Sequence, residues 1–200
     1  MLDFKSSLNT NLQLAFRNLG AFHFTQDYIR FENDTIGTEK KVDVTVQIQN
    51  RIIRNDDSIV RVPFQTYTIK DVNIFTDSTF ENRSKTINDS VNFDNYNVYA
   101  YEKLNYKPGA LTNAILIAKG SLFKDLDRSR TYRYLNELRT FKYPNIEYKE
   151  NDGDSTLTAN IYLIPKKTLA RRIVKSLIFL RNYLLRNMNQ LLMHYLIIMY

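Results

Sequence analysis

One acidic cluster has the residue types, and almost the spacing, of a calcium-binding loop. It reads Glu150-Asn-Asp152-Gly-Asp154. A calcium loop needs alternating Asp or Asn ligands, a glycine, and a glutamate further along the chain. Residues 155–165 contain no acidic residue, so that last ligand is missing. The sequence therefore predicts a solvated hairpin turn here and no metal site.

The histidines offer no catalytic group either. The chain has no cysteine, and its two histidines, His23 and His194, lie far apart in the sequence. His23 stands between Phe22 and Phe24 on a predicted strand, so its side chain should point away from the face that those rings share. No serine or second histidine nearby completes a nucleophile and base. We therefore expect no enzyme activity, no cofactor and no catalytic residue.

Basic and aromatic residues are mixed in "LNELRTFKYPNIEYKEND", residues 135–152. Such a mixture can stack on bases and neutralise phosphates, or it can join a helix end to a half-buried strand. The charge distribution favours the second interpretation. Seven basic residues follow Asp154, and without them the chain has 21 basic and 21 acidic residues. Any argument for an acidic partner therefore concerns the C-terminal tail alone.

The same stretch has an approximate counterpart in "FRNLGAFHFTQDYIRFEND", residues 16–34. Leu19, Phe22 and Phe24 align with Leu138, Phe141 and Tyr143. Both segments end in Glu-Asn-Asp, pass through a turn that contains glycine, and enter an alternating strand. The apolar face of that strand is Val42, Val44, Val46 and Ile48 in one copy, and Leu157, Ala159, Ile161 and Leu163 in the other. The repeat predicts two strand-turn-strand units, and the alternative is a chance similarity between them.

A helix is predicted before the first strand of each copy. In the first copy Leu8, Leu12, Phe16 and Leu19 recur at helical spacing, with Ser6 or Ser7 as a possible N-cap and Gly20 as the residue that ends the helix. In the second copy the apolar stripe is Tyr134, Leu135, Leu138 and Phe141, with Asp127 as a plausible N-cap. The shared unit is therefore helix, strand, turn, strand.

The second copy has further elements in front of it. Residues 64–77 alternate as a strand, with Tyr67, Ile69 and either Asp71 or its neighbour on one side. Residues 77–97 predict a long polar loop, and a helix is expected over 110–119. The second unit thus has the order β-α-α-β-β. The first copy begins inside what would be its second helix, without the initial strand and first helix.

This order of elements resembles a polypeptide-transport-associated (POTRA) domain. Such domains belong to BamA/TamA-type outer-membrane assembly proteins, and the long insertion is similar to the Bacteroidetes TamA-like kind. The resemblance rests on "KPG" entering the first helix, "AILIAKG" leading to "LFKDLD", "YLNEL" at the end of the second helix, and a last strand closing on "LIP". It covers residues 64–167 well and 4–50 in part.

The resemblance implies an α+β fold of tandem modules, each with two helices on one face of a three-stranded mixed sheet. A partial first module would span 1–55, and a second module would span 64–167 with a loop insertion at about 77–107. Such modules are not enzymes. They bind unfolded outer-membrane polypeptides or accessory subunits, often by adding a strand at an exposed sheet edge.

Two predicted edge strands supply the candidate polypeptide-binding residues. In the second module these are Tyr143, Asn145, Ile146, Glu147 and Tyr148, and in the first module they are Phe22, Phe24, Tyr28 and Phe31. The alternative for each side chain is that it packs on the helices or is simply solvated.

The tail, residues 168–200, differs in composition from the rest of the chain. Its apolar residues recur at helical spacing, and the basic residues off that stripe are Arg171, Arg172, Lys175, Arg181 and Arg186. This pattern is typical of a basic amphipathic helix at a membrane surface. A frameshifted or truncated barrel region, or a helix packed on the second module, are the alternatives.

The sequence therefore predicts a periplasmic scaffold module at the outer membrane, as part of a longer protein. Its expected partners are unfolded polypeptides or assembly subunits, without a nucleic acid or a small-molecule substrate. The N-terminal residues show no signal peptide. The alternative is a peripheral membrane or nucleic-acid binding protein that acts through the basic tail.

Overall fold

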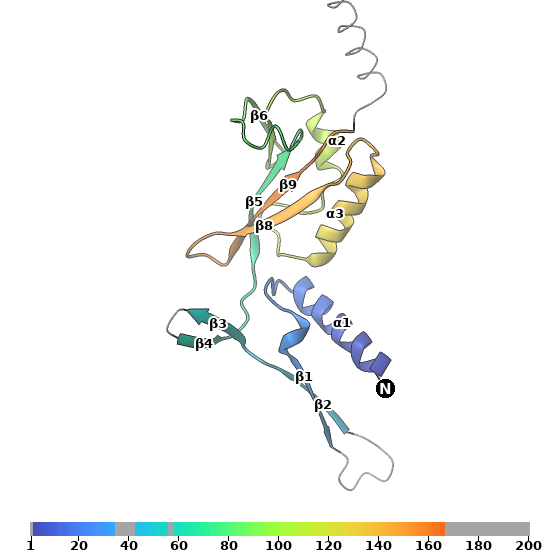
Figure 1. The fold of residues 1–200 in the computed structure, drawn as a ribbon, viewed down its shortest axis with the longest axis vertical. Coiled ribbons are helices and arrows are strands. Elements are labelled where there is room, and N and C mark those ends of the chain that lie inside the picture. The colour runs from blue at the N-terminus through green and yellow to red at the C-terminus, as the bar shows by residue number, and fades with distance from the viewer. Residues whose placement is uncertain (1, 35–42, 56–57, 167–200) are drawn as a thin grey trace, which may run out of the picture. The chain divides into compact units, whose positions relative to one another are not determined.

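The computed structural model describes residues 2–34, 43–55 and 58–166 (Figure 1). The chain divides into two compact units, residues 1–165 and 166–200, and only Lys166 of the second unit is described. The predicted basic tail therefore lies outside the described residues. The first predicted module, 1–55, lies within the first unit, and so does the second, 64–167, except for its last two residues.

The second module is built on a mixed sheet with the strand order β6-β7-β5-β9-β8. Its elements are β5 (Thr68–Phe75), β6 (Asp89–Phe93), β7 (Tyr96–Ala100), α2 (Pro108–Thr112), α3 (Asp125–Glu137), β8 (Asn145–Glu150) and β9 (Thr156–Tyr162). β5 runs parallel to β9, and β8 pairs antiparallel with β9. The predicted β-α-α-β-β order is confirmed, with the first strand beside the last.

One hydrophobic core joins the sheet and the two helices of the second module. Leu111 of α2 and Leu135 of α3 share this core with the inward face of β5 and β9. The predicted face of β9 is confirmed, because Leu157, Ala159, Ile161 and Leu163 are all fully buried. In β5 the register shifts between Ile69 and Asp71, so that Val72 enters the core in place of Asp71.

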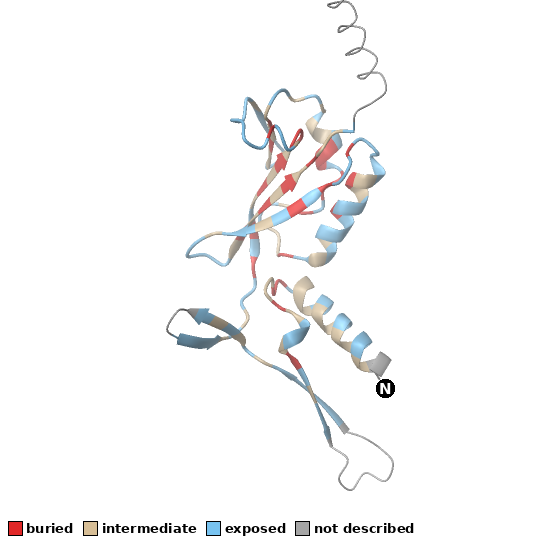
Figure 2. Cartoon of the chain, in the orientation of Figure 1, coloured by how far each residue is buried: buried red, intermediate tan, exposed pale blue. Residues whose placement is uncertain are grey.

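The first module contains a helix and two separate hairpins. Its elements are α1 (Leu2–Asn18), the short 3-10 helix η1 (Gln26–Tyr28), β1 (Ile29–Asp34), β2 (Asp43–Ile48), β3 (Arg51–Asn55) and β4 (Ser58–Val62). β1 pairs with β2, and β3 pairs with β4, each as a two-stranded antiparallel sheet. Figure 2 shows how little of these hairpins is buried, in contrast to β5 and β9.

Several predicted boundaries are wrong. Neither Ser6 nor Ser7 caps α1, because the helix begins at Leu2, and Asp127 lies inside α3, which begins at Asp125. The stripe on α1 is also shorter than predicted, since Leu19 is 64% exposed. Gly20 does follow the helix end with φ +93°, the left-handed conformation expected there. Arg139, the residue after Leu138 in the aligned copy, has φ +52°, so the two copies leave their helices alike.

Two further predictions failed because tertiary pairing overrides local pattern. The helix predicted over 110–119 ends at Thr112. The chain after it instead bonds to β5 and to the residue before β5, through Gly120 N–H to Ile69 O (2.7 Å) and Phe123 N–H to Tyr67 O (2.8 Å). The predicted loop at 77–97 contains β6 and the start of β7, which extend the sheet beyond the three strands expected.

Candidate polypeptide-binding edges

The strand β8 forms one edge of the five-stranded sheet, as the sequence predicted for residues 143–149. The structure places Asn145, Ile146, Glu147 and Tyr148 on β8, and Tyr143 just before it with 72% of its surface exposed. Asn151 N–H donates to Thr156 O at 3.1 Å. Antiparallel alternation from this bond turns the main-chain groups of Ile146 and Tyr148 toward the open edge.

The side chains of Ile146 and Tyr148 are occupied by the core. Ile146 is 5% exposed, and the Tyr148 ring packs edge-on against Phe123 at 5.2 Å and near Phe22 at 5.9 Å. Burial raises the pKa of the Tyr148 phenol, which therefore stays neutral. These side chains fix the strand, and its main-chain groups are what remains available to a partner.

The first-module candidates are arranged differently from the prediction. The strand begins at Ile29, so Phe22, Phe24 and Tyr28 precede it and do not belong to an edge strand. Phe24 is fully buried and stacks on Phe16 with ring centroids 4.5 Å apart. Of the four candidates only Phe31 lies in β1.

The physical reason is a chain reversal that the sequence pattern did not reveal. After the left-handed turn at Gly20, the carbonyl of Phe22 accepts a hydrogen bond from the Arg17 guanidinium at 2.6 Å. Phe22 then packs edge-on against Phe123 of the second module, with centroids 5.1 Å apart. The aromatic alternation at 22–24 therefore serves packing in two cores and does not mark a strand.

Arg17 lies at the centre of a joint between the two modules. Its guanidinium pairs with Asp125 at 3.2 Å and lies over the Phe123 ring at 5.3 Å. Beside it, the Asn18 side chain accepts a hydrogen bond from Leu126 N–H at 2.9 Å. The end of α1 thereby contacts the start of α3. Asp125 and the side-chain oxygen of Asn18 both stabilise this end of α3, because the N–H groups in the first turn of a helix have no carbonyl partner within the helix.

The joint has a second set of contacts around Gly20 and His23. Tyr67 N–H donates to Gly20 O at 2.9 Å. His23 Nε2 lies 2.9 Å from Glu150 Oε1 but is not aligned for a hydrogen bond, whereas Tyr67 Oη donates to Glu150 at 3.2 Å. Burial and the neighbouring Glu150 carboxylate raise the pKa of Tyr67. The sequence did not predict that His23 lies beside Glu150, because the two residues are more than a hundred positions apart in the chain.

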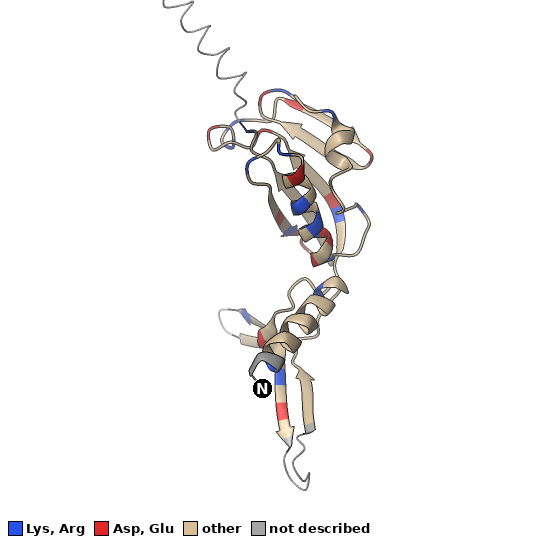
Figure 3. Ribbon diagram, turned by 90° about the vertical axis from the view of Figure 1, so that its right-hand side faces the viewer, with Lys and Arg blue, Asp and Glu red and all other residues tan. Residues whose placement is uncertain are grey.

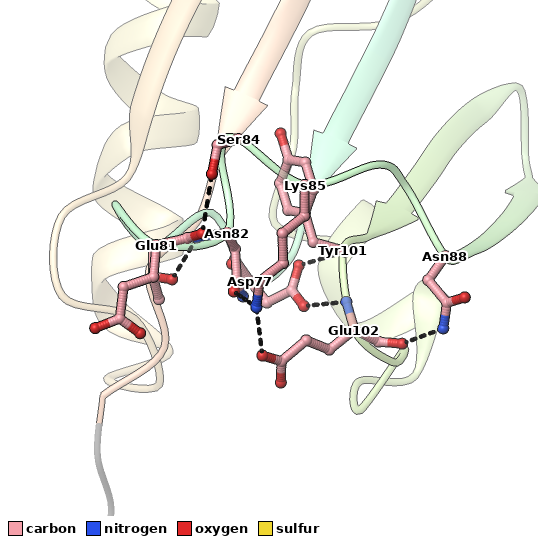
Figure 4. Close-up of polar contacts among 9 residues, drawn as sticks. Asp77, Glu81, Asn82, Ser84, Lys85, Asn88, Tyr101 and Glu102 are labelled. Carbon is pink, nitrogen blue, oxygen red and sulfur yellow. Dashed lines mark hydrogen bonds and ion pairs between the residues drawn. The ribbon is translucent and has the colours of Figure 1, made fainter.

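The strands β5, β9 and β8 are the three expected from the sequence. The inserted residues between β5 and α2 cover the side of β5 that does not pair with β9. β7 pairs parallel with β5, so the edges of the sheet are β6 and β8. Asp77, at the end of β5, holds this insertion in place (Figure 4). Its carboxylate accepts hydrogen bonds from Tyr101 N–H and Glu102 N–H, both at 2.9 Å. The insertion is therefore a fixed part of the module.

The described residues also show where charged side chains and possible metal ligands lie. In α3 the acidic residues Asp125 and Asp127 lie in the first turn, three arginines follow, and Glu137 ends the helix, so that both signs of charge occur along it (Figure 3). Among the described residues no group of three or more His, Asp or Glu side chains is placed to hold a metal ion. In the same part of the chain, no helix combines the length and apolarity needed to cross a bilayer. The five candidate tail residues lie outside it.

Comparison with known proteins gives similar solved structures and no match by sequence. No family model matches the chain, and no curated protein matches its sequence. BamA from Haemophilus ducreyi lacking POTRA domains 1–3 is similar over 82% of this chain and 23% of its own, at 7% identity and TM-score 0.49. POTRA3–5 of Haemophilus influenzae BamA covers 78% of both chains at 10% identity and TM-score 0.29. POTRA1–3 of the periplasmic domain of Omp85 from Anabaena covers 52% of this chain and 36% of its own, at 8% identity and TM-score 0.36.

The names of all three structures refer to POTRA domains. The chain spans 23% of the length of the first of them. The POTRA-like order of the second module is independently visible in its own strand pairing, β5 parallel to β9 and β8 antiparallel to it.

Proposed function

We propose that this chain is a scaffold region of an outer-membrane protein assembly or translocation factor. It faces the periplasm and binds unfolded polypeptides or accessory subunits by strand addition, without catalysing a reaction. The single observation that supports this function is the open main-chain edge of β8 on a rigid sheet. An extended chain of almost any sequence can pair with such an edge, because the bonds are made by the backbone.

The second module has two sheet edges, β6 and β8, and its structure favours β8 as the strand with which a polypeptide pairs. The hairpin β6–β7 covers the side of β5, and it leaves β6 as the opposite edge. β6 ends in a tight turn in which Asp94 and Asn95 have φ of 49° and 66°. β8 is the longer of the two edge strands.

A peptide titration followed by amide NMR tests this function. A peptide of alternating apolar and polar residues should shift the amide signals of Ile146 and Tyr148, whose N–H groups face the edge. The matched control is the same peptide with a central proline, which cannot donate to the ladder and should shift these signals far less. If the first peptide shifts only loop residues such as Lys103 and Asn105, the proposed function is wrong.

A further inference from the structure

Four asparagines form a continuous hydrogen-bonded row across the five-stranded sheet. Asn92 Nδ2 donates to Asn97 Oδ1 at 2.9 Å, and Asn97 Nδ2 donates to Asn73 Oδ1 at 3.0 Å. Asn73 Nδ2 in turn donates to Asn160 Oδ1 at 2.9 Å. In the strand register each asparagine lies directly opposite the next, across β6, β7, β5 and β9. The row lies on the outer face of the sheet, because Asn73 alternates with Val72 and Ile74, which enter the core.

The amides of this row keep part of their hydrogen-bonding capacity for a partner. A side-chain amide has two N–H donors and an oxygen with two lone pairs. Asn97 and Asn73 each use one donor and one lone pair within the row. Both side chains are partly exposed, as is Asn160, and Asn92 is exposed. Since asparagine is depleted in strands, four of them in one row are not explained by strand propensity.

A row of aromatic rings runs beside the asparagines, two residues further along β7, β5 and β9. Phe75 stacks on Tyr99 with ring centroids 5.3 Å apart and on Tyr162 at 4.9 Å. The Arg83 guanidinium lies over the Tyr162 ring at 5.4 Å. Packed rings have little freedom to reorient, so they form a rigid border along the amides. Tyrosine beside asparagine is a combination that antibody binding surfaces favour, because it joins rigid contact area to adaptable hydrogen bonding.

The two rows are uncharged from β6 to β9. In strand order the residues are Ser90, Tyr99, Phe75 and Tyr162 in one row, and Asn92, Asn97, Asn73 and Asn160 in the other. An anionic polymer such as a nucleic acid would require cations. An amphipathic helix would require an apolar groove, which a row of amides does not provide. The face therefore suits an uncharged partner that is rich in hydrogen-bonding groups.

The spacing of the amides distinguishes between uncharged partners. Adjacent strands lie about 4.8 Å apart, so the free donors and acceptors recur across the sheet at that interval. An extended polypeptide along the row would repeat every two residues, or roughly 6.5 Å, and would fall out of step. A hexose unit in an extended polysaccharide is about as long as the strand spacing. Its hydroxyl groups both donate and accept, as the free amide groups do.

We propose that the outer face of the second module binds a neutral glycan chain, which lies across the strands along Asn97, Asn73 and Asn160. The amides bond to the hydroxyl groups of successive sugar units, and the aromatic row borders the chain on one side. The site differs from the β8 edge, because it uses side chains on a sheet face and no open main-chain groups. It does not depend on polypeptide binding at β8.

NMR titration of the full chain with two uncharged oligosaccharides, cellohexaose and chitohexaose, tests the proposal. At least one of them should shift the side-chain amide signals of Asn73, Asn97 and Asn160 in a saturable way. Asn73→Thr interrupts the row with a good strand former and should weaken binding about tenfold, because it removes the central amide. The matched control Asn105→Thr replaces an exposed asparagine between β7 and α2 and should bind as the unchanged chain does.

A second variant keeps the test valid if the first disturbs the fold. The main-chain amide signals of Ile74 and Ile161 report whether Asn73→Thr retains the core. If they move throughout, Asn160→Thr at the end of the row takes its place, with the same loss of binding expected.

Three results would overturn the proposal. The first is the absence of saturable shifts on this face with both oligosaccharides at millimolar concentration. The second is equal binding by the row variant and the Asn105→Thr control. The third is a response of the same side-chain amides to the alternating peptide in place of the sugars, since the face would then take polypeptide. Peptide-induced shifts at Ile146 and Tyr148 are measured separately, so the failure of this proposal leaves the function proposed for β8 intact.

Discussion

The two modules of this chain share a sequence pattern and differ in what surrounds it. In both, a helix ends at a left-handed residue and an antiparallel hairpin follows, with apolar residues alternating along its second strand. β9 buries that face completely because β5, α2 and α3 surround it, whereas β2 leaves it about two-fifths exposed. The difference teaches that alternation specifies a strand and its inward face, while burial depends on neighbours far along the chain.

The largest expected contrast comes from matched truncations on the two strands. Ile161→Ala removes a fully buried side chain and should lower the free energy of unfolding by about 2–5 kcal/mol. Val46→Ala, at the equivalent position of β2, should cost roughly 1 kcal/mol or less, because the side chain is already 38% exposed. Denaturant unfolding measures both, and equal losses would contradict the comparison.

The next prediction concerns the insertion between β5 and α2, which adds β6 and β7 to the sheet of the second module. Asp77→Ala leaves the N–H groups of Tyr101 and Glu102 without their carboxylate and should cost about 2–3 kcal/mol. The control Asp152→Ala removes an exposed carboxylate and should stay within about 0.5 kcal/mol. Similar thermal unfolding of the two variants would show that Asp77 does not hold the insertion.

A smaller effect is expected at the joint between the modules. Gly20→Ala places a Cβ 2.8 Å from Leu122 on a backbone with φ +93°, and we expect a loss of about 1–3 kcal/mol. Gly153→Ala has φ +82° but open space around the new Cβ, so it should cost about 1 kcal/mol. The difference between the two variants isolates the contact across the joint, and it should vanish if the modules do not touch there.

The smallest effect should come from the ion pair in the same joint. A double-mutant cycle with Arg17→Met and Asp125→Asn should give a coupling of about 0.5–1 kcal/mol, since both side chains are only partly exposed. The coupling should weaken with added salt. Arg133 and Glu137, an exposed pair on α3, provide the control and should couple less.

The sequence predicted the second module better than the first, for physical reasons. Periodicity identified β9, α3 and the order of elements, because their apolar faces are buried within one core. A bulge in β5 places Val72 in the core where Asp71 was expected, and the chain after α2 is extended. Both features depend on hydrogen bonds between distant segments, which local sequence patterns do not reveal. The sequence predicts a loop over residues 77–97 because they are rich in Asn, Ser and Thr, and the strands β6 and β7 found there are only five residues long.

The candidate site residues were likewise predicted better in the second module than in the first. The edge position of β8 followed from the resemblance, and the strand order agrees with it. Phe22 and Phe24 were misplaced because aromatic alternation looks the same in a strand and in a turn that packs against two cores. The exposure of Val44, Val46 and Ile48 could not be predicted from the sequence, since their alternation is the same as that of the buried strand β9.

Amide hydrogen exchange, residue by residue, tests the central comparison most directly. Fast exchange is expected for Val44, Val46 and Ile48, whose N–H groups point away from β1 because Gln49 N–H donates to Tyr28 O in the same register. Strong protection is expected for Ala159, Ile161 and Leu163, which lie between β8 and β5. Equal protection of the two sets in the free chain would show that β2 is already paired and would contradict the account.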